Sequence, residues 1–439
     1  MRIIVLGAGH VGRAIVDALY EEHDITVIDT DAIRLQDLAD RYDVRIVEGN
    51  GTTKRVIKEA GIQDCSLFIA STSREEANLV SAMLVKKLSR AMVVVRTTSV
   101  EYLEAWRERE IDVDFMVSSE LETANAISGL IGIPAARQTD VFADGKVQVV
   151  EFDVPENASL TFTPLRDAEL PTESRVVAIL RGEQMLLPEG GAEFQPRDRI
   201  VVIASPNAAR QWSRAMSEDQ ERVDNIAIFG AGRMGTTIGR VLLDRGIRIR
   251  FVEGRPERAL EVAAELPQAR VFQASAFDPE FFTRERIGGA TAAVFALNDD
   301  PGNLFSAVLA KEHGVKLTIA LAHDQASLQV YERGGVDVAI NPRQVIAEEL
   351  VRFGHDPRIR QIAMLEDDRF EILDLTVRAE SELTDLHFRD LPKTPGAVIG
   401  ALVRGGTAIF PHSNDVLRAG DRAIVFVESR RASTVERIL

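Results

Sequence analysis

Two glycine-rich corners, 223 residues apart, constrain the fold of this chain more than any other feature of its sequence. In each, a run of apolar β-forming residues leads into Gly-x-Gly-x-x-Gly, and a helical pattern follows at once. The first glycine permits a tight turn, the second lets backbone approach a pyrophosphate, and the third lets the helix pack on the strand. Amides at the start of the helix then face the phosphates. The two corners are Gly7-Ala8-Gly9-His10-Val11-Gly12 and Gly230-Ala231-Gly232-Arg233-Met234-Gly235.

An acidic residue ends the strand that follows each corner. Asp29 ends the first such strand and Glu253 the second. Asp29 comes twenty residues after Gly9, the spacing at which a carboxylate binds the ribose hydroxyls of an adenosine. Asp29 or Thr30 also fits the cap of a helix over residues 32–42, and both roles can coexist. A glycine turn alone is a weak signal, but strand, glycines and acid together predict nucleotide binding.

The chain is a tandem duplication. The shift that relates the two corners also relates positions far downstream, namely Val117 to Ile340, Pro188 to Pro411, and Asp198 to Asp421. A chain of 439 residues is too long for one core and predicts two to four domains. We therefore expect two copies of one plan, each a nucleotide-binding fold followed by a smaller lobe.

Composition narrows the partners and the compartment. The chain is 45% hydrophobic and 27% charged, as in ordinary globular proteins, and its net charge of −16 argues against general affinity for nucleic acid or anionic lipid. Its apolar runs are too short to span a membrane or to form a signal peptide, which predicts a cytoplasmic protein without membrane insertion. The single cysteine, Cys65, excludes an internal disulfide and a thiolate metal cluster, and its apolar setting predicts an inert packed thiol.

Short apolar strands alternate with helices in the first 120 residues. Six strands are expected, at residues 2–6, 25–29, 44–47, 67–71, 92–96 and 115–118. This alternation predicts a doubly wound parallel sheet of the Rossmann-like α/β class, covered on both faces. The second copy of this fold is expected over residues 225–342.

Ligands bind such sheets beyond the carboxyl ends of the strands. In the first copy, the residues at these ends are Asp29, Asn50, Thr72, Ser73 and Arg96. A cation in this place can reach terminal phosphates, so Arg96 is a candidate phosphate ligand. A salt bridge from Arg96 to Glu75 or Glu101 is an equally open alternative.

A smaller lobe follows each nucleotide fold. Helices with polar and apolar faces over residues 119–131 and 343–354 are candidate crossover helices. Strands at 147–154, 175–181, 185–187 and 199–204, separated by turns, predict a small α+β lobe, and a corresponding lobe is expected over residues 370–439. The charged segment 213–224 fits an exposed linker between the copies.

Together these features resemble the RCK, or KTN, domain family. The resemblance rests on the paired corners, the acid-ended strands, the crossover helices, the stretch Ala296-Leu-Asn-Asp-Asp300, and Pro-x-Asp-Arg or Gly-Asp-Arg turns in the β lobes. It covers essentially the whole chain, and the tandem arrangement resembles the TrkA family of Trk potassium-uptake regulators. It implies RCK N-terminal domains over residues 1–120 and 223–342 and RCK C-terminal domains over residues 139–222 and 359–439.

The resemblance implies a non-enzymatic cytoplasmic subunit, peripheral to the inner face of the cell membrane. Members of the family assemble as rings beneath a potassium channel subunit and change its gating when NAD(H), ATP or ADP binds. We therefore expect a Trk-type channel partner and a homo-oligomer, either dimer or tetramer. The implied ligand contacts are the backbone from Gly7 to Val11, Asp29, Thr72, Ser73 and Arg96 in the first site, with Asp31 and Asn50 as weaker candidates, and the backbone from Gly230 to Met234, Glu253, Leu297 and Asn298 in the second.

The second copy departs from the family pattern in two places. The turn Gln273-Ala-Ser-Ala has no glycine where the first copy has Glu48-Gly-Asn-Gly, which predicts less room for a base or ribose. His323 stands where family members often carry a polar or basic residue, and either touches a phosphate or is a hydrogen-bonded strand-end histidine. His10, in the first corner, is expected to be an exposed side chain rather than a catalyst. The Glu253 carboxylate disfavours a ligand with a 2′-phosphate, such as NADP. The positive charge of Arg255 nearby partly offsets this effect.

Two other functions are compatible with the same corners. A nicotinamide-dependent dehydrogenase needs an acid or base at its hydride centre and a substrate pocket. None of the four tyrosines has a lysine four residues on, and no long insertion supplies a substrate domain, so we expect no enzymatic activity. A nucleotide sensor of another ion transporter would have the same sequence features as a Trk regulator.

Overall fold

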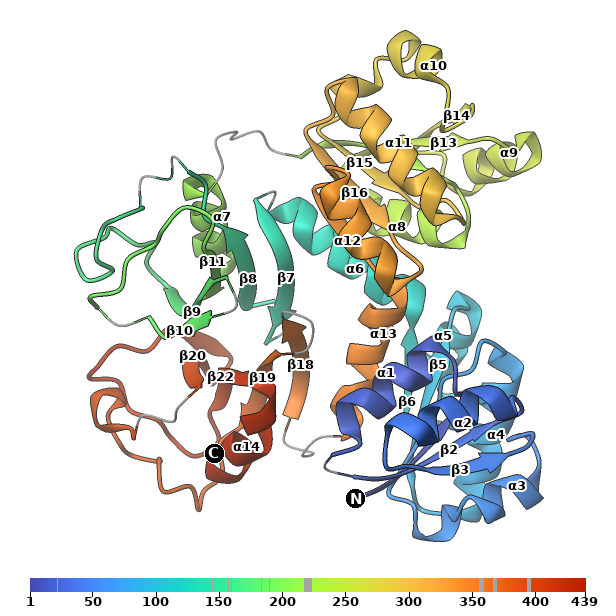
Figure 1. Cartoon of the computed structure of the whole chain (residues 1–439), viewed down its shortest axis with the longest axis vertical. Coiled ribbons are helices and arrows are strands. Elements are labelled where there is room, and N and C mark those ends of the chain that lie inside the picture. The colour runs from blue at the N-terminus through green and yellow to red at the C-terminus, as the bar shows by residue number, and fades with distance from the viewer. Residues whose placement is uncertain are drawn as a thin grey trace. The chain divides into compact units, whose positions relative to one another are not determined.

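The computed structural model describes the chain except for residues 22, 134, 144, 157, 159, 183, 189, 217–222, 355–358, 366–368 and 393–395. Half of the expected linker at 213–224, and one residue of the turn after Arg181, thus lie outside the described residues. Within the described part, no helix has the length and apolarity needed to cross a bilayer. The chain contains four sheets, one for each expected lobe (Figure 1).

The first sheet is parallel and six-stranded, in the order β3-β2-β1-β4-β5-β6. This is the doubly wound order in which ligands bind where the strand order reverses, next to β1. The prediction of six alternating strands is confirmed. The strands are β1 (Arg2–Leu6), β2 (Asp24–Asp29), β3 (Arg45–Glu48), β4 (Leu67–Ala70), β5 (Met92–Thr97) and β6 (Phe115–Ser118).

Helices cover both faces of this sheet. The short helix α3 was not predicted, because its six residues are too few for a helical period to show. The core between helices and sheet includes Ile4, Phe68, Val93 and Cys65. The helices are α1 (His10–Leu19), α2 (Ala32–Arg41), α3 (Lys54–Glu59), α4 (Glu75–Leu88), α5 (Val100–Arg107) and the crossover helix α6 (Ser119–Gly132).

The second nucleotide lobe repeats this plan, with strand order β14-β13-β12-β15-β16-β17. Stacked aromatic rings of Phe229, Phe282 and Phe295 fill its centre. Its strands are β12 (Asn225–Phe229), β13 (Arg248–Glu253), β14 (Arg270–Gln273), β15 (Ala292–Phe295), β16 (Leu317–Leu321) and β17 (Val338–Ile340). Its helices are α8 (Arg233–Asp244), α9 (Pro256–Glu265), α10 (Pro279–Arg284), α11 (Asp300–Glu312), α12 (Gln325–Arg333) and the crossover helix α13 (Pro342–Val351).

Each small lobe is a five-stranded antiparallel sheet with a helix after its last strand. The orders are β10-β9-β11-β8-β7 and β18-β19-β22-β20-β21. The first lobe comprises β7 (Ala136–Phe142), β8 (Val147–Asp153), β9 (Ser174–Arg181), β10 (Gln184–Leu186), β11 (Arg199–Ala204) and α7 (Pro206–Ala215). The second comprises β18 (Ile359–Leu365), β19 (Phe370–Thr376), β20 (Ala397–Arg404), β21 (Thr407–Ile409), β22 (Arg422–Glu428) and α14 (Ala432–Ile438).

The first strand of each small lobe was missed from sequence. β7 reads Ala-Arg-Gln-Thr-Asp-Val-Phe, and its polar residues conceal the alternation by which strands are predicted. These two segments are strands because each pairs with a neighbour: β7 runs antiparallel to β8, and β18 runs antiparallel to β19.

The two small lobes share one apolar core. Phe142, Val149 and Ile203 of the first lobe pack in the same cluster as Leu365 and Phe426 of the second. Two reciprocal hydrogen bonds join the edge strands: Gln138 Nε2 donates to Met364 O at 2.8 Å, and Gln361 Nε2 donates to Val141 O at 2.9 Å. The duplicated lobes therefore fold as a pair.

The chain divides into two compact units that do not follow the repeat boundary. The first unit comprises Met1–Thr123, Ala322–Gln325 and Ile340–Asp356, and the second comprises the rest. The crossover helix α13 of the second repeat thus packs on the first nucleotide lobe, beside α1 (Figure 1). Gly354, just after α13, lies against Leu19 at the end of α1, and Phe353 packs on Phe115 with ring centroids 4.7 Å apart.

Candidate functional site

The first glycine corner has the geometry that a phosphate cradle needs. Gly7 has a φ of +113°, a conformation that favours glycine. A Cβ on Gly12 would lie 1.8 Å from Gly7 O, so the third glycine is required for α1 to pack on its own strand. A Cβ on Gly9, in contrast, would have Arg34 Nη1, at 3.9 Å, as its nearest neighbour. Because the end of the Arg34 side chain is the only group of the described residues near this position, a ligand can approach the helix amides there.

The second corner repeats this geometry. Gly230 has a φ of +93°, and a Cβ on Gly235 would lie 2.0 Å from Gly230 O. A Cβ on Gly232 would meet no atom within 4 Å. In both corners, therefore, the outer glycines satisfy packing and the middle glycine keeps the approach to the helix amides clear.

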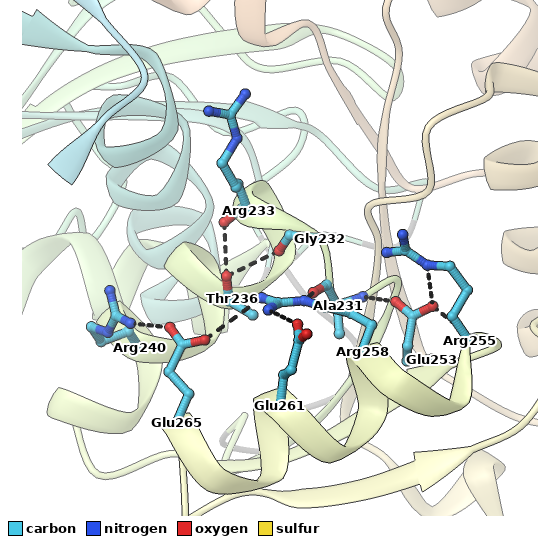
Figure 2. A network of polar contacts seen from close by, with 10 residues as sticks. All are labelled: Ala231, Gly232, Arg233, Thr236, Arg240, Glu253, Arg255, Arg258, Glu261 and Glu265. Atoms are coloured by element: carbon cyan, nitrogen blue, oxygen red, sulfur yellow. Dashed lines mark hydrogen bonds and ion pairs between the residues drawn. The ribbon is translucent and has the colours of Figure 1, made fainter. Parts of the chain in front are cut away.

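The acid after each corner turns toward the corner. Asp29 Oδ2 accepts a hydrogen bond from Ala8 N at 2.6 Å, and its Oδ1 accepts one from Asp31 N at 2.9 Å. Glu253 makes the same pattern with Ala231 N at 3.0 Å and Arg255 N at 2.9 Å (Figure 2). Each carboxylate is thus fixed beside the turn by two backbone amides.

The helix-capping alternative for Asp29 is wrong, because the cap of α2 is Asp31. The Asp31 carboxylate accepts from Ile33 N and Arg34 N and pairs with the Arg34 guanidinium at 3.1 Å. Asp31 therefore holds α2 in place, and Asp29 is left to face the corner.

Hydrogen bonds and charge keep Glu253 ionised. Burial alone would raise its pKa, but hydrogen bonds from the Arg255 and Ala231 amides, together with the Arg255 guanidinium 3.2 Å away, hold that pKa below its ordinary value. Arg258 donates to Ala231 O at 2.8 Å and links the corner to α9 (Figure 2). The second corner is therefore anchored to both strand and helix.

The strand ends of the first lobe meet around Asn78, which is fully buried. Its Oδ1 accepts from Thr72 N, and its Nδ2 donates to Thr72 O and to Arg96 O at 3.1 Å. One amide side chain thus joins the ends of β4 and β5 and brings Thr72, Ser73 and Arg96 to the same edge. Asn50 lies at the end of β3, where its Oδ1 accepts from Thr52 N at 3.0 Å and stabilises its own turn.

Arg96 is half-buried and donates from Nε to Ser119 Oγ at 2.9 Å. The pKa of Arg96 lies below the ordinary arginine value, mainly because of burial; Glu120 acts in the opposite sense and Arg343 in the same sense. Glu75, one of the partners weighed from the sequence, also raises the pKa of Arg96 through its charge. It accepts hydrogen bonds from the Thr97 and Thr98 side chains and from Ser99 N at 3.1 Å.

Sequence reasoning missed Arg343, which joins the first site from the second repeat. Its Nη1 donates to His323 O at 2.8 Å, and the guanidinium lies 3.6 Å from Asp324. The His10 side chain is largely exposed, as expected. Its pKa lies below the ordinary histidine value, first because the ring is partly desolvated and second because of the Arg343 charge. Arg343 is the second residue of α13, which begins at Pro342, but no periodicity in the sequence indicates which lobe that helix covers.

The second lobe carries the equivalent of Asn78. Asn303 Oδ1 accepts from Leu297 N at 2.8 Å, and its Nδ2 donates to Leu297 O and Leu321 O. Leu297 therefore stands in the place of Thr72, and Leu321 in the place of Arg96. His323 comes two residues later. The cation of the first site thus has an apolar residue as its counterpart in the second.

A pocket of about 400 Å³ opens beside the second corner. The absence of glycine from the turn 273–276 predicted less room for a base or ribose here. In the structure, residues of this turn line the pocket. Glycines in the first lobe serve packing instead: a Cβ on Gly49 would lie 2.6 Å from Val56, and one on Gly51 would lie 2.5 Å from Leu6. The lining residues are Gly230, Val252, Glu253, Gly254, Gln273, Ser275, Ala276, Phe277 and Leu297.

Six of these lining residues, among them Ser275 and Phe277, were not predicted as site residues. Ser275 Oγ accepts from Phe277 N at 3.2 Å, as Asn50 does from Thr52 N, so the two turns are equivalent. The position of Asn50 in the first copy was the signal that could have identified them.

Cys65 is confirmed as a packed thiol. It is buried, and its Sγ donates to Leu67 O at 3.0 Å. Burial raises its pKa to about 11. The described residues hold no cluster of His, Cys, Asp or Glu side chains suited to a metal ion.

Comparison with known families agrees with the duplicated geometry. The TrkA-N domain matches residues 3–119 and 226–342, and the TrkA-C domain matches residues 149–216 and 372–439. The chain belongs to the tandem TrkA-N/TrkA-C family. This confirms the resemblance drawn from the sequence.

Full-length relatives share the whole TrkA-N/TrkA-C arrangement. A Trk system potassium uptake protein TrkA homolog of Archaeoglobus fulgidus is 29% identical over 440 residues and is covered completely, as is this chain. The Trk system potassium uptake protein TrkA of Vibrio alginolyticus is 29% identical over 443 residues, covering 98% of this chain and 96% of that protein.

Solved structures share the fold at low identity. The GsuK RCK domain is 14% identical with a TM-score of 0.61, covering 100% of this chain and 94% of that one. The GsuK channel bound to NAD is 15% identical with a TM-score of 0.62, covering 100% and 78%. The tandem TrkA-N/TrkA-C chain therefore has the RCK fold.

Proposed function

We propose that this chain is a cytoplasmic nucleotide-binding regulatory subunit of a Trk-type potassium uptake system. The observation that carries the proposal is the open approach at Gly9 and Gly232, each beside a carboxylate fixed by the corner's own amide. Full-length similarity to Trk system potassium uptake proteins supports the transport system. The subunit is peripheral to the membrane, assembles as a homo-oligomer and contacts a membrane channel subunit.

The proposed ligands are NAD(H), ATP and ADP. The residues fit an adenine nucleotide, because the middle glycines keep the helix amides accessible to a pyrophosphate and the carboxylates stand where ribose hydroxyls would lie. In the first site, Asp29 would hold the ribose, the backbone from Gly7 to Val11 would bind phosphate, and Arg96 would meet a terminal phosphate. The similarity to an NAD-bound channel structure supports NAD as a ligand class.

Regulation follows from the way the second repeat completes the first site. A ligand can shift a conformational equilibrium only through its different affinity for the two states. Arg96 belongs to the first nucleotide lobe and Arg343 to α13, so a terminal phosphate between them would interact with both repeats. The separate domains proposed at residues 1–120, 139–222, 223–342 and 359–439 would then be coupled through the crossover helices.

The test compares ATP and ADP binding by calorimetry in a chain whose second corner is closed by Gly232→Ala. Removing the cation with Arg96→Ala should weaken ATP at least about tenfold and ADP much less, because a hydrogen bond to a charged group contributes about 1.5–3 kcal/mol. Arg90→Gln is the matched control, since this exposed arginine lies where the chain enters β5, at the opposite end of the sheet. An unchanged ATP-to-ADP ratio in Arg96→Ala would refute the phosphate role.

A second measurement tests the partner. Vesicles that contain a Trk-type channel subunit should take up potassium at a rate that changes when the chain and ATP or ADP are added together. Uptake that ignores the chain at every nucleotide concentration would refute the regulatory function while leaving nucleotide binding intact.

A further inference from the structure

The two corners share the features proposed to bind the ribose and pyrophosphate of a nucleotide. They differ in the residues that would lie near its terminal phosphate. The glycine turn and the fixed carboxylate are present in both, so each can hold a ribose and a pyrophosphate. Around the buried asparagines the two lobes diverge. Thr72 and Arg96 of the first lobe correspond to Leu297 and Leu321 of the second, and Leu321 is 2% exposed.

Two cations near the second corner, Arg255 and Arg258, bind groups of the corner or of α9. Arg255 pairs with Glu253 at 3.2 Å, and Arg258 donates to Ala231 O and pairs with Glu261 at 2.9 Å. Arg233, at the position of His10, points away from the Glu253 carboxylate (Figure 2). The strand-end position that carries Arg96 in the first lobe is therefore apolar here.

The second pocket has an aromatic side chain where the first lobe has a threonine. Phe277 lines the pocket in the place of Thr52, and 48% of its surface is exposed. Phe305 of α11 holds it edge-to-face, with ring centroids 6.0 Å apart. A half-exposed ring fixed on one side and facing a cavity of about 400 Å³ on the other offers a flat surface for another ring.

We propose that the second pocket recognises purine nucleotides by stacking the base on Phe277 and binding the ribose at Glu253, without distinguishing a diphosphate from a triphosphate. This inference rests on the nucleotide binding proposed above and adds the ligand chemistry of the second site. The second site then reports the total purine nucleotide pool, while the first site, with Arg96, distinguishes triphosphates from diphosphates.

A fluorescence experiment tests the selectivity directly. Phe277→Trp places an indole against the ligand, and the parent chain, which contains the two native tryptophans, supplies the background. AMP, ADP, ATP and NAD should all quench the added fluorescence, and the half-saturating concentrations of ATP and ADP should agree within about twofold. An ATP preference of tenfold or more at the introduced indole would overturn the proposal.

Truncation of the ring tests stacking. In a chain whose first corner is closed by Gly9→Ala, Phe277→Ala should weaken all adenine nucleotides about tenfold or more, because stacking of one base contributes about 1–3 kcal/mol. Phe277→Leu, which keeps the apolar bulk, should recover only part of the loss. Equal affinities of parent and Phe277→Ala, with unchanged thermal unfolding, would overturn the stacking role.

The outcomes separate the two proposals. If calorimetry on the parent chain shows no binding of any adenine nucleotide, the proposed function fails. If the parent binds nucleotides but the introduced indole does not respond, only the inference about the second pocket fails.

Discussion

Exchanging Gly9 and Gly12 separately for alanine should separate ligand binding from folding at the first corner. The two positions lie three residues apart, and the added methyl is the same, but their surroundings are opposite. A Cβ on Gly12 would lie 1.8 Å from Gly7 O, whereas a Cβ on Gly9 would lie 3.9 Å from its nearest neighbour.

The magnitudes follow from these distances. For Gly12→Ala, the methyl and the Gly7 carbonyl must separate by about 1.2 Å to reach even 3.0 Å, so α1 must move off its strand. Overpacking of a core costs about 1–3 kcal/mol and more where backbone must shift. Gly9 has an extended backbone with φ of −76°, which alanine adopts without strain. Its methyl should leave folding intact and block the phosphate, which removes hydrogen bonds of about 1.5–3 kcal/mol each.

The assay pairs urea unfolding with calorimetric titration of ATP in the parent and both variants. Gly9→Ala should unfold like the parent and lose one binding site per chain, or bind there at least about tenfold more weakly. Gly12→Ala should unfold at lower urea. Parent-like ATP binding in Gly9→Ala, or parent-like stability in Gly12→Ala, would refute this assignment of roles.

Two further predictions concern parts of the molecule outside the nucleotide sites. Asp198 is 1% exposed and accepts two hydrogen bonds from Arg181 at 2.8 Å, while the Arg181 side chain is 36% exposed. Asp198→Asn should therefore destabilise the first small lobe by about 1.5–3 kcal/mol in urea, the contribution of a hydrogen bond to a charged group, whereas Asp167→Asn at an exposed pair should change little. Cys65 has its pKa raised to about 11, so iodoacetamide should label the native chain slowly at pH 8 and the urea-unfolded chain rapidly. Rapid labelling of the native chain at pH 8 would contradict the buried thiol. Because the thiol ionises at lower pH in the unfolded chain than in the native chain, the free energy of unfolding should fall as pH rises from about 9 to 11.

Sequence reasoning succeeded for the nucleotide lobes because their constraints are local. The corner glycines, the strand before them and the helix after them lie within a few residues, and the steric need is visible in the letters themselves. Both sheets of the nucleotide lobes are parallel and doubly wound, as predicted. The edge strands β7 and β18 were missed, because they are stabilised by pairing with a neighbour rather than by an apolar alternation of their own.

The candidate site was predictable in part for the same reason. Asp29 and Glu253 were identified from spacing, and both carboxylates do face their corners. The equivalence of Arg96 with Leu321 was not visible, because the shift between the repeats grows from 223 residues at the corners to 225 at Asn78 and Asn303. The asparagine hydrogen bonds and the strand registers of the structure identify the two positions as equivalent.

The sequence by itself determined that there are two copies, where each chain corner lies, and which acid stands beside it, since these depend on short-range sterics and on spacing along one strand. The tertiary structure alone decided that α13 of the second repeat packs on the first nucleotide lobe and brings Arg343 to its site. It also decided that Phe277 lines the second pocket and that the two small lobes share a core. These contacts join residues far apart in the chain, and they arise from which apolar faces are buried together, which no periodicity in either partner specifies.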